Sequence, residues 1–300
     1  MSTTALVAPP SRAQVWWLAI RPRTLGAAFA PVMLGTAIAY AAGRLHVPSA
    51  LAALWGAVWL QIGTNFANDL FDFEKGADSA TRVGPVRVTQ AGLVSPRAMR
   101  AATIAAYSLV LPAALYLSWR GGGALLLLAL ASIAAGLLYT GGPRPYGYVG
   151  LGELFVFVFF GPIAVAGTAY VQTLQLSPLA VLIGCIPGLV ACAMLAVNNL
   201  RDEATDRAAG KRTLAVRFGP AFARWEIAGS LVGAALLIVA TSLAGGHPAA
   251  MISLLPAVVL IPGILRTVWR TEGRALNPML GAVGKLLILE CALFAVGWMI

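Results

Sequence analysis

Long apolar runs recur along the whole of this 300-residue chain. Each is about 20 residues long, which lets an α-helix cross the ~30 Å hydrocarbon core of a bilayer. Charged residues make up only 11% of the chain, against roughly 25% in soluble proteins. The sequence therefore predicts an all-α, polytopic membrane bundle forming one domain over 1–300. The nine predicted spans are 24–42, 48–70, 96–119, 121–140, 151–171, 178–199, 222–244, 248–270 and 278–300.

The boundary between the third and fourth spans is marked by Arg120 and three glycines, which predicts a hairpin rather than one long helix. At the start of the chain, no short apolar stretch precedes a small-residue cleavage site, so no removable signal peptide is expected.

Positive charge is distributed unevenly between the predicted loops. If the spans alternate, 18 Lys and Arg residues fall on one face, and only Arg44 and Arg120 fall on the other. This bias predicts a multi-pass protein of the inner (plasma) membrane, with its N-terminus and charged loops cytoplasmic and its C-terminus outside. The net charge of +10 is explained by this distribution and does not indicate nucleic-acid binding.

Seven of the 11 acidic residues lie in two short stretches. The first, at the end of span 48–70, contains Asp69, Asp72, Glu74 and Asp78, and the second, after span 178–199, contains Asp202, Glu203 and Asp206. These two spans are an even number apart, so both run in the same direction. Both acidic stretches are therefore expected at the same membrane face, at one mouth of the bundle.

The spacing within each stretch places polar side chains on one helix face. Asn68 and Asp72 are four residues apart, and Asn198, Asp202 and Asp206 repeat the same interval. The two stripes offer only carboxylate and carboxamide oxygens, with no Cys or His nearby. Such ligands suit Mg²⁺, which prefers one or two carboxylates together with phosphate oxygens and water.

Basic residues follow both acidic stretches: Lys75, Arg82, Arg87, Lys211 and Arg212. A metal together with Lys and Arg is a common way to hold a diphosphate and to neutralise it as a leaving group. Taken singly, each of these residues could equally form an ion pair at a helix end in water. The two matched stripes favour a diphosphate site that opens into apolar helices, which suits a ligand with a long hydrocarbon tail.

Ionisation of an allylic diphosphate leaves a carbocation, which aromatic faces stabilise by cation–π attraction. Simple packing is the alternative explanation for an aromatic residue in a membrane span. The candidates by position are Phe66, Phe71, Tyr139, Tyr146, Phe155 and Phe159.

The two acidic stretches resemble the motifs of the UbiA superfamily of intramembrane prenyltransferases, and most of all its naphthoate branch. The first reads Asn-Asp-Leu-Phe-Asp-Phe-Glu-Lys-Gly-Ala-Asp over 68–78, and an Arg-x-Gly-Pro-x-Arg tail follows. The second begins at Asn198 and continues through Asp206 to Arg217. The opening Arg-Pro-Arg-Thr at 21–24 and the stretch 139–162 also agree. The resemblance extends over nearly the full chain.

This resemblance implies a bundle of nine helices around a central cavity, capped from the cytosol by the two motifs. It implies Mg²⁺ as cofactor, and polyprenyl diphosphate and 1,4-dihydroxy-2-naphthoate as substrates within the lipid bilayer. The expected reaction is attack of an allylic cation on the ring carbon that bears the carboxylate, with loss of diphosphate and CO₂. The expected metal ligands are Asn68, Asp69, Asp72, Asp78, Asn198, Asp202 and Asp206. The expected diphosphate-binding residues are Lys75, Arg82, Arg87, Lys211, Arg212, Tyr139 and Arg144.

Ionisable groups inside spans cost about 2.5–3.5 kcal/mol on insertion scales and tend to be functional. Lys285 and Glu290 both lie within the last span. The ammonium group of Lys285 could attract the naphthoate carboxylate. Lys285 therefore joins Asp72 and Asp202 as a candidate catalytic residue. Glu153 could instead pair with Arg144 at a helix end.

The same sequence features allow other functions. Nine spans with intramembrane acids could form a transporter, although transporters place such acids near the middle of the membrane. Among enzymes, the alternatives are a phytyl donor, or another acceptor such as homogentisate, 4-hydroxybenzoate, a porphyrin or a glycerol-based lipid. The length of the prenyl chain does not follow from residue spacing.

Overall fold

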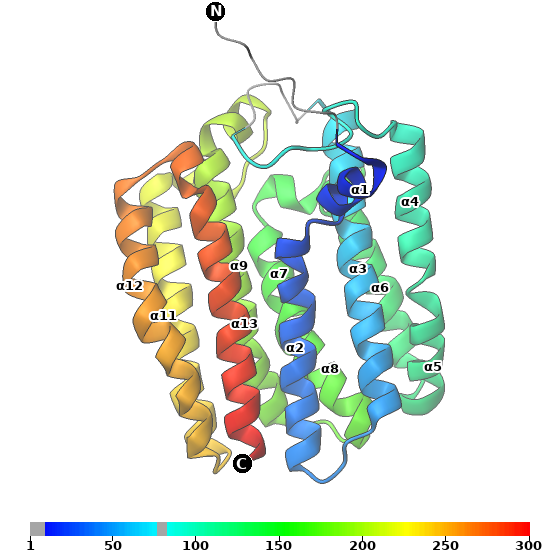
Figure 1. Ribbon diagram of the computed structural model, residues 1–300, viewed down its shortest axis with the longest axis vertical. Coiled ribbons are helices and arrows are strands. Elements are labelled where there is room, and N and C mark those ends of the chain that lie inside the picture. Colours follow the sequence, from blue (N-terminus) through cyan, green and yellow to red (C-terminus); the bar gives the residue numbers. More distant parts are fainter. Residues whose placement is uncertain (1–9, 77–82) are drawn as a thin grey trace, which may run out of the picture.

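The structure is a computed structural model that describes residues 10–76 and 83–300. Over these residues the regular secondary structure is entirely helical, as Figure 1 shows. The α-helices are α1 (Arg12–Ile20), α2 (Pro22–Ala41), α3 (Val47–Glu74), α4 (Pro96–Ser108), α5 (Leu111–Gly121), α6 (Ala124–Leu138), α7 (Gly152–Phe160), α8 (Pro162–Thr173), α9 (Pro178–Ala208), α10 (Leu214–Phe218), α11 (Pro220–Ala244), α12 (Leu254–Arg270) and α13 (Asn277–Met299). Three 3₁₀ segments are η1 (Tyr146–Val149), η2 (Pro248–Ser253) and η3 (Gly273–Leu276).

The long helices run side by side and alternate in direction, so the chain passes repeatedly between the two ends of the bundle (Figure 1). Eight segments of the described chain, of 20 to 31 residues, are long and apolar enough to cross a membrane. The predicted fourth span corresponds to α6, which has 15 residues and lies beside α3 and α5. The all-α membrane bundle is confirmed, and eight of the nine predicted spans correspond to segments long enough to cross a membrane, whereas α6 is a shorter apolar helix.

The hairpin predicted before α6 is present. Its turn uses Gly122 at a φ of 100°, and Arg120 donates hydrogen bonds to the carbonyls of Val171 and Gln172. This turn lies at the end of the bundle drawn at the bottom of Figure 1, called the lower end below. The contacts keep one of the few cations at this end close to the polypeptide backbone.

Two predicted spans are broken rather than continuous. The third consists of α4 and α5, with the break directly before Pro112, and the fifth consists of α7 and α8, with the break at Gly161 before Pro162. Proline removes a helical hydrogen bond and clashes with the preceding turn, which explains both positions. At the second break the backbones meet closely, since a Cβ on Gly184 of α9 would lie 2.6 Å from Cα of Pro162. Glycine is needed there for this approach.

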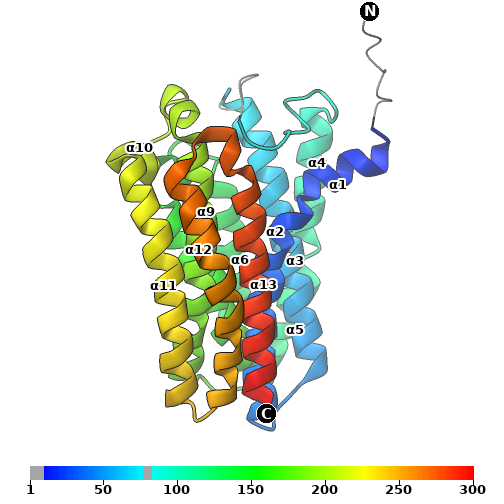
Figure 2. The ribbon, with the colours of Figure 1, turned by 60° about the vertical axis from the view of Figure 1, so that its left-hand side comes forward.

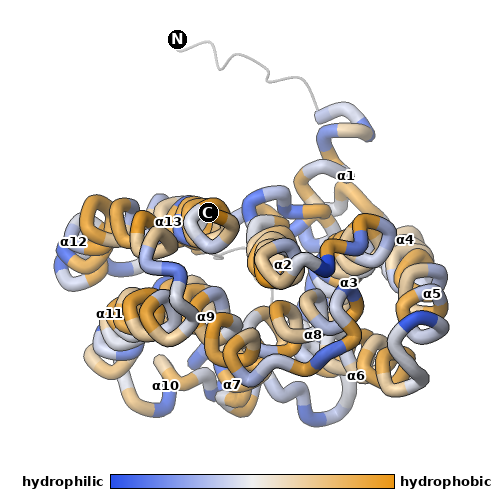
Figure 3. The backbone as a smooth tube through the Cα atoms, turned by 90° about the horizontal axis from the view of Figure 1, so that it is seen from below, coloured by the Kyte–Doolittle hydropathy of each residue, from blue (hydrophilic) through white to orange (hydrophobic). Residues whose placement is uncertain are grey.

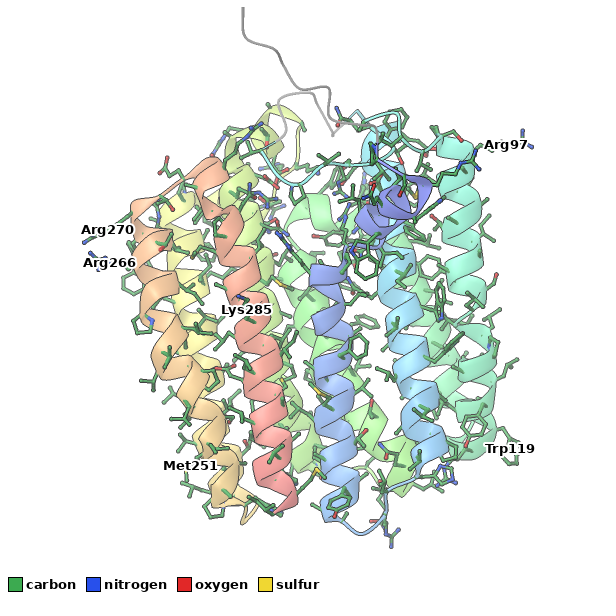
Figure 4. All side chains as sticks on the ribbon, viewed as in Figure 1. Arg97, Trp119, Met251, Arg266, Arg270 and Lys285 are labelled. Carbon is green, nitrogen blue, oxygen red and sulfur yellow. The ribbon has the colours of Figure 1, made fainter. Side chains whose placement is uncertain are left out.

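Apolar side chains lie on both the inside and the outside of the bundle. The largest buried cluster joins α2, α9, α11, α12 and α13, and the end-on view of Figure 3 is hydrophobic over most of each helix. Trp225, near the start of α11, packs against Trp269, near the end of α12. Trp119 projects outward at the opposite, lower end (Figure 4). Tryptophans at both ends are typical of the two interfaces of a bilayer. The chain is an integral membrane protein.

Helix α1 lies outside the bundle at its upper end, as the rotated view of Figure 2 shows. A capping box between Ser11 and Gln14 begins it, and Arg21 ends it in the left-handed conformation, with a φ of 55°. Arg21 also precedes α2, so this residue makes the turn between the two helices.

Candidate active site

Asp72 is at the centre of a buried ionic cluster near the upper end of α3. This helix continues to Glu74, four residues beyond the predicted span, and therefore carries the first acidic motif. Asp72 is only 1% exposed. One carboxylate oxygen accepts from Arg87 Nη2 at 2.8 Å, and the other accepts from Tyr148 Oη at 2.6 Å and Lys211 Nζ at 3.4 Å.

Lys211 connects the two acidic motifs. Besides its contact with Asp72, its ammonium lies 3.7 Å from Oδ1 of Asp206 at the end of α9. A positive charge is thus held between one carboxylate of each motif. The two motifs lie side by side at the same end of the bundle, as the direction of their spans predicts.

The segment after α6 covers this cluster. Lys75 donates to the carbonyls of Thr140 and Gly142, both at 2.7 Å, and the hydroxyl of Thr140 donates to Asn68 Oδ1 at 3.0 Å. The pKa of Lys75 is lowered, mainly because burial disfavours its charged form. Attraction to Asp72 partly offsets this shift, and repulsion from Lys211 adds to it.

The ring of Tyr148, in η1, contacts both lysines, with its centroid 5.3 Å from Lys75 Nζ and 4.7 Å from Lys211 Nζ. The residue patterns considered above did not identify Tyr148. Its place in a Gly- and Pro-rich loop gives no periodic signal, and only the fold brings it to Asp72.

Asp202 faces the same end but has a different partner. Its carboxylate binds the guanidinium of the adjacent Arg201 through two hydrogen bonds of 2.8 and 2.5 Å. Arg201 also donates to Asn277 of α13, and Asn277 in turn donates to the carbonyl of Val83. This chain of contacts ties α9 and α13 to the loop that follows the first motif.

Asp69 anchors that loop. Its two carboxylate oxygens accept the backbone N–H groups of Val88 and Thr89 at 3.2 and 3.0 Å, and Arg21 lies 3.9 Å away. The donors to Asp69 are backbone N–H groups that hold the loop, whereas those to Asp72 and Asp202 are side chains. The geometry therefore favours a structural role for Asp69 over the predicted metal ligation.

Three further predicted site residues are exposed and lie outside the ionic cluster around Asp72. Arg144 and Arg212 are exposed, although the backbone N–H of Arg212 bonds to the carbonyl of Tyr148. Lys285, labelled in Figure 4, is exposed on α13 and is not among the residues that line the cavity described below. The geometry therefore does not support the prediction that Lys285 is catalytic. Two further predicted residues, Asp78 and Arg82, lie outside the described residues.

Glu153 does not have the partner proposed from the sequence. Its carboxylate is buried near the start of α7 and accepts from Asn199 Nδ2 at 2.6 Å. The suggested pairing with Arg144 is wrong, because the buried carboxylate faces α9 whereas Arg144 is exposed.

A cavity of about 340 Å³ begins beneath the cluster and extends between α2, α3, α5, α6, α7, α8 and α9. Asn68 and Asn198, one from each motif, both line it. Most of the remaining lining is apolar, including Leu117, Leu125 and Leu128. The combination of an ionic upper end and an apolar interior suits a ligand with a charged head and a hydrocarbon tail.

Four of the predicted aromatic residues line the cavity: Tyr139, Tyr146, Phe155 and Phe159. Tyr139 meets Tyr146 edge to face at 5.4 Å, and Tyr146 stacks on Phe155 at 4.0 Å, measured between ring centroids. Phe66 and Phe71 belong instead to packed clusters beside α3. Because these two rings do not line the cavity, packing explains them.

The side-chain oxygens of the two motifs are of the type that binds a hard divalent cation. The ligands that the two motifs offer are carboxylate and carboxamide oxygens, and Lys211 places a positive charge between Asp72 and Asp206. Within residues 10–76 and 83–300, no three His, Cys, Asp or Glu side chains converge as a ready-made metal cluster. Lysine and arginine, rather than further acids, surround the carboxylates.

Taken together, these features define a membrane-embedded helical bundle with a polar site for an amphipathic anion at one end of an apolar cavity. Comparison with known proteins identifies the class. Residues 28–286 match the model of the UbiA prenyltransferase family, and the chain belongs to this family.

Similar proteins include two bacterial enzymes named 1,4-dihydroxy-2-naphthoate octaprenyltransferase. The one from Escherichia coli K12 is 38% identical over 294 residues, with 96% of each chain covered. The one from Mycobacterium tuberculosis is 41% identical over 276 residues, covering 91% of this chain and 92% of the relative. Among solved structures, a UbiA homologue from Archaeoglobus fulgidus bound to DMAPP and Mg²⁺ shares the fold, with a TM-score of 0.60 at 18% identity. The match covers 95% of this chain and 98% of that one.

Proposed function

We propose that this chain transfers a polyprenyl group from polyprenyl diphosphate to 1,4-dihydroxy-2-naphthoate, with loss of diphosphate and CO₂, giving a demethylmenaquinol. The observation that carries the proposal is the meeting of the two acidic motifs at Lys211, above an apolar cavity. The names of the bacterial relatives, at 38% and 41% identity, support the naphthoate as acceptor.

The proposed reaction breaks the allylic C–O bond of the donor and forms a C–C bond to the ring carbon that carries the carboxylate. The electron pair of the C–C bond to that carboxylate then returns to the ring as CO₂ leaves, which restores aromaticity. Atoms and electrons balance without an oxidant, a reductant or a further proton acceptor.

Mg²⁺ is the proposed cofactor, and when bound it would neutralise charge on the leaving diphosphate. Its proposed ligands come from the oxygen set of the two motifs: Asn68, Asp72, Asn198, Asp202 and Asp206. Lys75, Arg87 and Lys211 lie around Asp72 and would hold phosphate oxygens by charge-assisted hydrogen bonds. The Mg²⁺ bound in the Archaeoglobus fulgidus structure supports the choice of metal.

The aromatic row formed by Tyr139, Tyr146, Phe155 and Phe159 is proposed to face the allylic cation. Aromatic faces attract a cation within about 6 Å of the ring centroid. The apolar lining farther down the cavity would hold the first part of the prenyl tail.

The upper end of the bundle is proposed to face the cytoplasm. Arg44 follows α2 and Arg120 lies in the last turn of α5, both at the lower end, whereas most other Lys and Arg residues belong to the loops and helix ends of the upper end (Figure 1). Cytoplasmic loops are enriched in Lys and Arg, which supports a cytoplasmic active site in the plasma membrane.

The direct test is a transfer assay with the purified protein, a labelled polyprenyl diphosphate and a panel of acceptors that includes homogentisate and 4-hydroxybenzoate. The proposal expects a CO₂-releasing product with 1,4-dihydroxy-2-naphthoate, and little or none with the others. Equal or better transfer to another acceptor would contradict the naphthoate assignment while leaving prenyl transfer intact.

A further inference from the structure

Below Asn68, the cavity wall contains a second polar group that the diphosphate site does not use. Gln61 and Asn65 of α3 and Thr24 of α2 all line the cavity, and both amides are buried, 8% and 3% exposed. Gln61, Asn65, Asn68 and Asp72 are spaced four, three and four residues apart, so they share one face of α3. The pair Gln61 and Asn65 is called the amide pair below.

The donors of the amide pair are already committed. The hydroxyl of Thr24 donates to the carbonyl of Arg21 at 2.9 Å, so it can only accept from the two amides. Asn65 Nδ2 donates to Thr24 Oγ1 at 2.9 Å and to the carbonyl of Ile20 at 2.8 Å. Gln61 Nε2 donates to Thr24 Oγ1 at 3.2 Å. These contacts fix which end of each amide is oxygen.

The oxygens of the pair lack comparable partners. Gln61 Oε1 is buried without a hydrogen-bond partner, and Asn65 Oδ1 has only a contact of 3.5 Å from Gln61 Nε2. A buried acceptor left in this state is unfavourable unless a donor reaches it. The amide pair therefore suits a ligand with an O–H group, and it disfavours a carboxylate or phosphate, which would bring more lone pairs to the same place.

The depth of the amide pair in the cavity matches the aromatic acceptor rather than the polyprenyl diphosphate. Along the axis of α3, Asn65 lies about 4.5 Å and Gln61 about 10.5 Å below Asn68, at 1.5 Å per residue. An arene that reacts just beneath the diphosphate would have its ring substituents at this level, whereas the prenyl tail has no donor to offer.

Building on the function proposed above, we propose that Gln61 and Asn65 bind a ring hydroxyl of the aromatic acceptor and so select a hydroxylated arene. Gln61 is the more useful residue to change, because its side chain does not hold α1 and α2 together as Asn65 does through Ile20 and Thr24. Gln61→Met keeps the length of the side chain and removes the acceptor oxygen, together with the amide N–H that donates to Thr24 Oγ1.

The experiment compares 1,4-dihydroxy-2-naphthoate with two analogues, each lacking one of the hydroxyls, in wild-type and Gln61→Met protein. We expect Q61M to lower kcat/KM for the dihydroxy acceptor by about tenfold, as loss of one hydrogen bond to a buried group predicts. For at least one monohydroxy analogue the two proteins should agree within about twofold, since that hydrogen bond is already absent. The KM for polyprenyl diphosphate should not change.

Gln172→Met is the matched control. Gln172 in α8 is also a buried amide with an unpartnered Oε1, but it is not among the residues that line the cavity. Its substitution should leave the preference among the three acceptors as in wild type.

An equal loss by Q61M on all three acceptors, or no loss on any, overturns the role of the amide pair. Wild-type protein that prenylates none of the three overturns the proposed function as well, so the two failures are distinguishable.

Discussion

Lys211 Nζ lies 3.4 Å from Asp72 Oδ1, although the two residues are 139 positions apart in the chain. Arg87 holds the other oxygen of Asp72, and Lys75 lies over the Tyr148 ring beside it. Among the described residues, the three cations Lys75, Arg87 and Lys211 therefore lie around the carboxylates of Asp72 and Asp206. The local excess of positive charge suits a ligand that is itself strongly anionic, such as a metal-bound diphosphate.

Substitution of Asp72 should abolish most of the activity. Asp72→Asn removes the charge that Arg87 and Lys211 contact and that Mg²⁺ would use, so we expect prenyl transfer to fall by at least about 100-fold. The measurement is kcat/KM with labelled donor, alongside thermal unfolding in detergent, since a buried ion pair is also broken.

Glu74→Gln provides the control for Asp72→Asn. It makes the same chemical change two residues away, where Glu74 pairs with the exposed Arg100. Exposed pairs contribute little, so activity should stay within about twofold of wild type. A similar loss in both variants would indicate that net charge, rather than the position of Asp72, matters.

Lys211→Met should weaken binding of the donor specifically. Hydrogen bonds to charged groups contribute about 1.5–3 kcal/mol, which predicts a rise of roughly 10- to 100-fold in the KM for polyprenyl diphosphate. The KM for the naphthoate should change little. Arg270→Met, which removes a cation that projects away from the bundle in Figure 4, serves as control. If the acceptor KM rises instead, Lys211 contacts the other substrate.

Asp69 and Asp72 are expected to behave differently although they are three residues apart. Asp69→Asn weakens the anchoring of the loop at Val88 and Thr89, so we expect a loss of about 1–3 kcal/mol in stability. Faster backbone hydrogen exchange at these two residues would reveal it, with little change in the Mg²⁺ concentration needed for half-maximal activity. A large increase in that concentration would restore Asp69 to the metal ligands.

Lys285→Met should leave the Michaelis constant for the naphthoate unchanged. The side chain is exposed on α13, and a long Lys stem at such a position can bring its charge toward the membrane interface. Kinetics at saturating donor would test this. A several-fold rise in the acceptor KM would show that Lys285 does attract the carboxylate.

The membrane fold was predictable because each span must satisfy its backbone hydrogen bonds internally, which leaves a long apolar signal. The breaks at Pro112 and Gly161 were not predicted, because the apolar runs continue through them. Similarly, the shared direction of the two spans predicted that both motifs lie at the same end of the bundle, where Asp72 and Asp206 each contact Lys211.

What remained hidden depends on contacts rather than on spacing. Asp69 and Asp72 are the same residue type and lie three positions apart in the sequence. Only the hydrogen bonds from the backbone of residues 88 and 89 show that Asp69 holds the loop. Lys285 looked functional because it interrupts an apolar span, yet it lies on the exposed face of its helix. Gln61 and Asn65 could have been noticed, since they extend the face of Asn68 and Asp72 by two turns.

The central claim is that the two motifs together hold a divalent ion and the phosphates of the donor. Its most direct measurement is single-turnover transfer by protein freed of divalent ions and then titrated with Mg²⁺. The account predicts no product in chelator and a saturable recovery with Mg²⁺, shifted to higher concentration by Asp206→Asn. Full turnover in chelator would contradict it.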